Sequence, residues 1–142
     1  MAITLSQDLN INNFFEKSKN IIIFKDGKSK LYKQNTQEYK NVMEKFMQHT
    51  NYSYEMPAFG VSLHNETVKA MQSGVWIRFD FETEQQHNGM PFNSLLINIT
   101  QDMYGFNVIR MQGKEYDGRC FYLNLEDNMN DFYYYLNNEF KK

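Results

Sequence analysis

The sequence predicts an α+β fold in which an antiparallel sheet, made of an N-terminal hairpin and a C-terminal four-stranded meander, is covered by helices. Three patterns support this prediction. The dipeptide Asp26-Gly27 separates two short strand-like segments, apolar residues recur at helical spacing within residues 39–47, and four strand-like segments follow one another within residues 75–125. Strands and helices do not alternate as βαβ units, so we do not expect a doubly wound nucleotide-binding fold.

The N-terminal segment predicts a helix followed by a hairpin. The helix would cover residues 6–18 and begin at Ser6. The apolar side chains available to dock this helix on a core are Leu9, Phe14 and Phe15. Residues 20–25 and 29–33 then predict two strands, because Asp-Gly adopts the positive backbone angles of a tight hairpin turn.

A second helix is predicted to begin at Asn35, since Asn35 and Glu38 have the spacing of a capping box. Its apolar face comprises Tyr39, Val42, Met43, Phe46 and Met47. Residues 51–57 are irregular, residues 58–63 suggest a short strand, and Asn65 is expected to cap a short helix that ends before Ser73-Gly74.

The second half of the chain predicts the meander, with strands at residues 75–82, 94–100, 106–111 and 119–125 and turns at 102–105 and 112–118. A final helix begins near Asn128 and places Met129, Phe132, Tyr133, Leu136 and Phe140 on one side. Alternation in the first of these strands sends one set of side chains inward: Val75, Ile77, Phe79 and Phe81. The opposite set is Trp76, Arg78, Asp80 and Glu82. We expect Phe46, Phe79, Phe121 and Leu123 to be buried.

Composition limits the class of protein. The 142 residues carry 15 Lys plus Arg against 17 Asp plus Glu, which suits one domain spanning residues 1–142. The single cysteine, Cys120, excludes an internal disulfide. The longest apolar run is residues 21–24, far below the roughly 20 residues that span a bilayer. Residues 1–10 lack the basic and apolar regions of a signal peptide, so we expect a cytoplasmic protein that does not bind membranes.

Nucleic acid is not an expected partner. A basic segment runs over residues 17–33, but the isoelectric point of the whole chain is near 5.9. Domains that bind nucleic acid through phosphate contacts usually have isoelectric points above about 9. A solvated, lysine-rich hairpin explains the segment better.

Catalytic and metal-binding motifs are sparse, and we predict no metal and no cofactor. The glycine that a phosphate-binding loop needs five residues before Gly27 is replaced by Ile22. Cys120 is expected to be a buried, inert thiol. Alternate residues of the strand place the carboxylates of Asp80, Glu82 and Glu84 on one face, with His87 nearby. This group could serve a divalent cation or acid-base chemistry, although a solvated sheet face leading into a polar loop at residues 83–89 is the favoured interpretation.

The remaining candidate is a protein-binding surface. Trp76 and Arg78 share the outward strand face, and such pairs are frequent in interface cores. Arg110 and Arg119 lie on neighbouring strands of the last hairpin, and Tyr122 follows on the same strand as Arg119. The three arginines could converge on an anion or on a partner's carboxylates, or each could pair with an acid across strands.

We therefore expect a small protein-binding module, of an inhibitor, immunity or regulatory kind, whose partner is another protein or a second copy of the chain. Two alternatives stay open. The first is a small-molecule-binding protein or a metal-dependent enzyme that uses the Asp80, Glu82 and His87 region. The second is that a helix of the same chain covers Trp76, which would remove the outward face from consideration.

Overall fold

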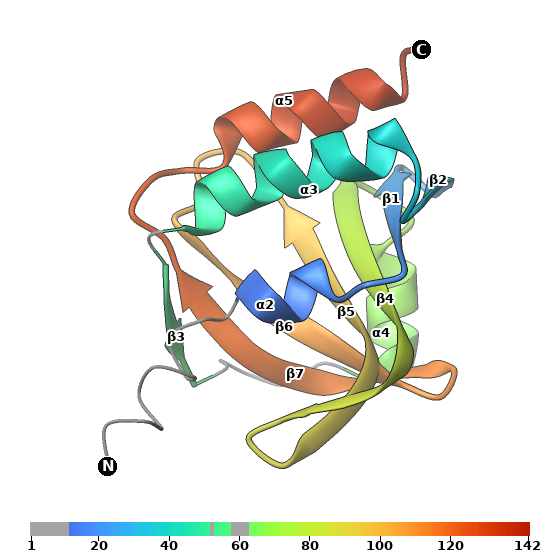
Figure 1. Cartoon of the computed structure of the whole chain (residues 1–142), viewed down its shortest axis with the longest axis vertical. Coiled ribbons are helices and arrows are strands. Elements are labelled where there is room, and N and C mark those ends of the chain that lie inside the picture. The colour runs from blue at the N-terminus through green and yellow to red at the C-terminus, as the bar shows by residue number, and fades with distance from the viewer. Residues whose placement is uncertain (1–11, 52, 58–62) are drawn as a thin grey trace.

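The computed structural model describes residues 12–142 except 52 and 58–62, and within these residues one seven-stranded sheet has the order β2-β1-β4-β5-β6-β7-β3 (Figure 1). Neighbouring strands are all antiparallel. The α+β class and the antiparallel sheet predicted from the sequence are thereby confirmed.

The strands are β1 (Asn20–Lys25), β2 (Lys28–Lys33), β3 (Tyr54–Met56), β4 (Val75–His87), β5 (Met90–Ile99), β6 (Gly105–Gln112) and β7 (Glu115–Asn124). The helices within the described residues are α2 (Asn12–Glu16), α3 (Gln37–Thr50), α4 (His64–Ala70) and α5 (Asn130–Glu139). Helices α3 and α5 lie side by side across one face of the sheet, and α4 lies on the other face (Figure 1). We refer to these as the inner and the outer face.

The turn of the N-terminal hairpin has the backbone angles that its Asp-Gly sequence favours. Asp26 and Gly27 have φ values of 49° and 85°, which a two-residue hairpin turn requires at both positions. The predicted turn is confirmed, and β1 then pairs with β4 on its other side. Lys25 lies opposite Val75 and Asn20 lies opposite Asp80, so this pairing joins the hairpin to the meander.

The N-cap of helix α3 lies one residue later than predicted. Thr36, with an extended backbone, is the N-cap, and its hydroxyl accepts a hydrogen bond from the backbone N–H of Tyr39 at 3.2 Å. The expected start at Asn35 is wrong because threonine supplies the same capping oxygen one position further on. The predicted apolar face is confirmed, since the buried residues of the helix include Tyr39, Val42, Met43 and Phe46.

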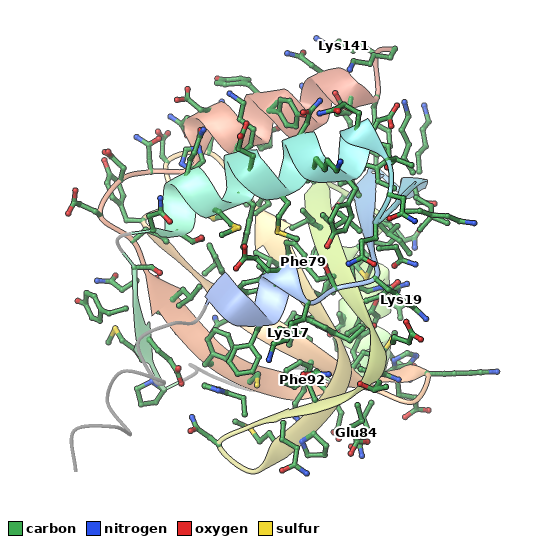
Figure 2. The ribbon with its side chains drawn as sticks, in the orientation of Figure 1. Lys17, Lys19, Phe79, Glu84, Phe92 and Lys141 are labelled. Carbon is green, nitrogen blue, oxygen red and sulfur yellow. The ribbon has the colours of Figure 1, made fainter. Side chains whose placement is uncertain are left out.

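The inner core is built from aromatic rings. Phe15 of α2, Phe46 of α3 and Phe79 of β4 contact one another, with ring centroids 4.8 Å apart in each of the three pairs. Figure 2 shows Phe79 on the strand beneath the helices. Phe121 and Leu123 are buried in the same cluster, so the four residues expected in the core are all confirmed there.

Several local expectations differ from the structure. Strand β4 continues to His87, because a register shift between Asp80 and Gln85 absorbs the irregularity and the turn falls at Asn88-Gly89, where both residues have positive φ. The polar loop predicted at residues 83–89 is therefore mostly strand. The turn predicted at residues 112–118 is shorter, because β7 begins at Glu115.

Three further expectations concern the middle and the ends of the chain. Residues 54–56, predicted as irregular, form the edge strand β3 beside β7. The cap of α4 is Leu63 instead of Asn65, and α5 begins at Asn130. The strand predicted at residues 58–63 lies outside the described residues except for Leu63, and so do Ser6 and Leu9 of the first predicted helix.

Among the described residues, no helix is long and apolar enough to cross a bilayer, and the longest, α3, has 14 residues.

Removal of the Phe79 ring should cost much of the fold's stability. Phe79→Ala leaves a cavity between α2, α3 and the sheet, so we expect the free energy of unfolding to fall by about 3 to 5 kcal/mol in urea denaturation. The exposed Val68→Ala on α4 is the control and should change it by less than about 0.5 kcal/mol. Equal effects of the two substitutions would contradict the assigned core.

Candidate functional site

Trp76 does not belong to an accessible surface. Only 5% of the residue is exposed, and its indole N–H donates to the backbone carbonyl of Ser73 at 2.9 Å. It packs on the outer face of the sheet with Met71, Leu96, Ile109 and Tyr116. Strand alternation did send Trp76 outward, but α4 and the residues that follow it close over that part of the sheet. The expectation that Trp76 is accessible for binding is therefore wrong.

Arg78 lies next to this outer cluster with its guanidinium occupied. Its Nε and Nη2 donate to the two carboxylate oxygens of Asp80 at 2.8 and 3.3 Å, and its Nη1 donates to the hydroxyl of Tyr116 at 3.0 Å. Ser94 also donates to Asp80 at 2.7 Å, and the guanidinium lies over the ring of Phe24. Burial alone would lower the pKa of Arg78, but Asp80 outweighs it and the pKa is raised. This network holds together β1, β4, β5 and β7.

Arg110 points away from Arg78. The cross-strand partner of Arg78 is Leu96, which lies in the outer cluster, whereas the partner of Arg110 is Leu95, which lies in the inner core. Residues opposite each other share a sheet face, so the two guanidinium groups leave the sheet on opposite sides. The hypothesis that Arg78 and Arg110 converge on one anion is therefore wrong.

Arg110 is hydrogen-bonded within the chain. It donates to the backbone carbonyl of Pro91 at 2.7 Å and to the carboxylate of Asp117 at 3.3 Å. The side chain of Arg119 lies outside the described part of the structure. Only its backbone is placed, opposite Ile109.

The carboxylates and His87 of the enzyme alternative do not gather at one place. Asp80 is bound by Arg78 and Ser94, and Glu82 is exposed. His87, which follows the register shift, bonds instead to Glu55 of β3, with 2.7 Å between its Nε2 and the carboxylate. Within the described residues, no three His, Cys, Asp or Glu side chains are arranged to hold a metal ion.

The environment of His87 is aromatic. Its ring contacts Phe14 of α2 and Phe121 of β7 at centroid distances of 5.0 Å. The His87–Glu55 bond joins the β4–β5 hairpin to β3, which is the last strand of the sheet in the strand order. A contact between these distant positions requires a strongly curved sheet, as Figure 1 shows. The pair closes the open end of the inner core.

Cys120 has the properties of a structural thiol. It is buried, and burial raises its pKa to about 12 although Arg110 acts in the opposite direction. A thiol with so high a pKa carries almost no thiolate at neutral pH, and thiolate is the reactive form.

An open groove of about 480 Å³ lies between α2 and α3. Its lining mixes methionine side chains of α3 with the charged groups of Glu16, Lys40 and Glu44. The small-molecule alternative expected a pocket between sheet and helices, whereas this groove lies between two helices.

Tyr122 is the predicted binding residue that stays accessible in part. It lies on β7 between Met56 of β3 and Asn107 of β6, and the next cross-strand row is Tyr54, Asn124 and Gly105. All of these positions share the outer face, because they alternate with the buried Phe121 and Leu123. We call Tyr54, Met56, Asn107, Tyr122 and Asn124 the tyrosine face.

Tyr54 is the most exposed member of this face, at 57%. Its hydroxyl accepts a hydrogen bond from Asn124 Nδ2 at 2.6 Å, which fixes the ring on the sheet. Gly105 leaves the space that the Tyr122 ring occupies, since a Cβ at that position would overlap the ring. Tyr104, which directly precedes Gly105, is 55% exposed.

Sequence reasoning missed Tyr54 and Tyr104. Tyr54 lies on a strand of only three residues, too short for alternation to be recognised, and Tyr104 lies in a predicted turn. For Tyr104 the available signal was the adjacent Gly105 at the start of a strand, whereas nothing in the local sequence marked Tyr54.

The opposite edge of the sheet, strand β2, is held in place by α5. Lys30 Nζ donates to the backbone carbonyl of Glu139 at 2.6 Å, and the hydroxyl of Tyr32 donates to the Glu139 carboxylate at 2.6 Å. Lys142 adds an ion pair to the same carboxylate at 2.8 Å. Burial would raise the pKa of Glu139, but these hydrogen bonds and the charges of Lys142 and Lys30 outweigh it and lower the pKa.

Comparisons with known proteins give no relative: no family model, no curated protein and no solved structure matches this chain.

Removal of the Asp80 carboxylate should destabilise the fold. Asp80→Asn leaves the mostly buried Arg78 without its charged partner, so the free energy of unfolding should fall by about 1 to 3 kcal/mol. The matched control is Asp117→Asn, which removes the carboxylate from the more exposed pair with Arg110 and should cost less than about 1 kcal/mol. Urea denaturation measures both. A larger loss for Asp117→Asn would contradict the structural role of the Arg78 network.

Glu139 should make stability depend on pH in the acid range. Its pKa is lower in the folded chain, so the unfolded chain binds more protons between the two pKa values. We expect the contribution of Glu139 to be complete above the ordinary carboxyl pKa of about 4.3 and to be lost as pH falls through the lower folded value. Chemical denaturation between pH 3 and pH 7 measures this, and Glu139→Gln should flatten that part of the curve. An unchanged slope in the variant would disprove the assignment.

Proposed function

We propose that the chain is a protein-binding module whose contact surface is the tyrosine face. The observation that carries the proposal is the exposed Tyr54, whose ring is fixed by the hydrogen bond from Asn124. An aromatic side chain that is ordered before binding loses little conformational entropy on contact and buries a large area. Interface cores are enriched in tyrosine for these reasons.

The neighbouring groups support the same interpretation. Tyr122 and Met56, both half-buried, extend the aromatic and apolar area around Tyr54. None of the five residues of the tyrosine face is charged, and charged residues are depleted at the centre of interfaces. A partner that buries this face would be recognised by shape and hydrogen bonding.

Truncation of Tyr54 should weaken the binding of a partner that uses this face. We expect Tyr54→Ala to weaken binding by about 2 kcal/mol or more, the effect of losing an interface hot spot. Tyr134→Ala on α5, another half-exposed tyrosine, is the control and should bind like the native chain. The measurement is affinity capture from the source cells followed by calorimetric titration of the captured protein.

Two results would contradict this location of the surface. One is a partner that binds Tyr54→Ala and Tyr122→Ala as tightly as the native chain. The other is a partner lost equally with the Tyr134→Ala control. If the partner is a second copy, sedimentation should show a concentration-dependent dimer that Tyr54→Ala dissociates.

The metal-dependent enzyme alternative predicts a different response. A metal ion held at a hundredfold excess over its dissociation constant stabilises the folded chain by about 2.7 kcal/mol. For the protein-binding proposal we expect no change in melting temperature with Zn²⁺ or Mg²⁺ in calorimetry. A clear rise, lost in Asp80→Asn or His87→Ala, would favour the enzyme.

A further inference from the structure

Strand β2 is the last strand at one end of the sheet, and no described strand pairs with its free edge. Lys25 and Lys28 flank the two-residue turn, and the N–H of Gln34 donates to the carbonyl of Lys19 at 3.1 Å. In an antiparallel pair the backbone groups of alternate residues point to the same side, so the even-numbered residues of β2 face β1. The N–H and C=O groups of Ser29 and Leu31 therefore point away from the sheet.

This edge is ordered by packing on its inner face. Lys30 and Tyr32 are both bound to Glu139 of α5, and Lys30 also lies over the ring of Phe140. The strand is thus held in its pleated form although no described strand pairs with its free edge. A strand fixed in this way is a template to which another extended segment can add.

The side chains of the edge select the kind of segment. Lysine occupies three of the six positions, at Lys28, Lys30 and Lys33, and Lys28 and Lys33 are exposed. Two copies of the chain paired along β2 would bring lysines against lysines, which disfavours a homodimer at this edge. A segment that carries carboxylates has the complementary charge.

The two faces of β2 carry different side chains, and a strand added at this edge would need side chains that match each face. Lys28 and Lys30 lie on the inner face, since their partners Lys25 and Ile23 pair in turn with Val75 and Ile77 of the core. Leu31 is on the outer face and is 50% exposed, opposite the half-buried Ile22. Lys33 shares the outer face at the end of the strand. A neighbouring strand with acidic residues on its inner side and an apolar residue beside Leu31 would match both faces.

We propose that the β2 edge binds an extended acidic segment of a partner protein as an added strand. The backbone of that segment pairs with Ser29 and Leu31, its carboxylates lie beside Lys28 and Lys30, and its apolar side chains lie beside Leu31. The site is at the opposite end of the sheet from the tyrosine face and does not depend on the function proposed for that face.

The test uses a blocked decapeptide of alternating glutamate and valine. We expect it to slow hydrogen exchange at the amides of Ser29 and Leu31 in NMR spectra of the full chain, and to bind more weakly as salt is added. The same peptide with lysine in place of glutamate should leave both amides unprotected. A ten-nucleotide single-stranded DNA is the third probe.

Two variants and a matched control keep the test independent of folding. Lys28→Glu should weaken binding of the acidic peptide about tenfold or more, equivalent to about 1.4 kcal/mol. Lys40→Glu makes the same charge change on α3 and should bind like the native chain. Leu31→Pro, which removes the outward N–H but no bond to β1, should abolish protection at Ser29 while the core resonances stay unchanged.

Each remaining outcome overturns the proposal. Protection by the lysine peptide would show that charge does not select the segment, and equal binding of the DNA without protection at Ser29 and Leu31 would show a polyanion site instead. Protection that rises with protein concentration and needs no peptide would assign the edge to a second copy. Failure of the acidic peptide to protect either amide would exclude strand addition at β2.

Discussion

The contact among Phe15, Phe46 and Phe79 is the packing interaction on which the inner half of the molecule depends. These rings come from α2, α3 and β4, and no two of them belong to adjacent elements of the chain. Few small side chains are available to fill such a core, because the sequence has 12 phenylalanines and only three alanines. Large rings separate the helices from the sheet, and the strong curvature of the sheet brings both its ends around them.

That curvature determines which surfaces remain for function. The inner face is filled by α2, α3 and α5, and its open end is closed by the bond between His87 and Glu55. Part of the outer face is covered by α4 and the cluster around Trp76. Within the part of the chain that the structure describes, two regions that these helices leave uncovered are the two ends of the sheet, one rich in tyrosine and amides and the other rich in lysine. Both candidate surfaces thus follow from where the chain's own helices do not reach.

The regular elements with clear periodicity could be predicted from the sequence, because their signals are local. The Asp26-Gly27 turn, the apolar face of α3 and the inward side of β4 each depend on residues within a few positions of one another. The binding residues were harder to predict. The alternation that sends Trp76 outward says nothing of what covers it, and α4, which does so, has no strong amphipathic pattern. Whether Arg78 and Arg110 share a face depends on strand order and on register shifts, which a single sequence does not encode locally.

The pairing of β1 with β4 has a consequence for the order in which the molecule assembles. Gly74 N–H donates to the Asp26 carboxylate across a separation of 48 residues, so the hairpin joins the meander only after α3 and α4 have been synthesised. A hairpin closed by Asp-Gly forms within about 1 to 10 μs, whereas the ribosome adds about 5 to 20 residues each second. For several seconds the nascent hairpin therefore has two open edges instead of one. Lysine side chains along these edges carry like charges, which disfavour edge-to-edge pairing of two such hairpins.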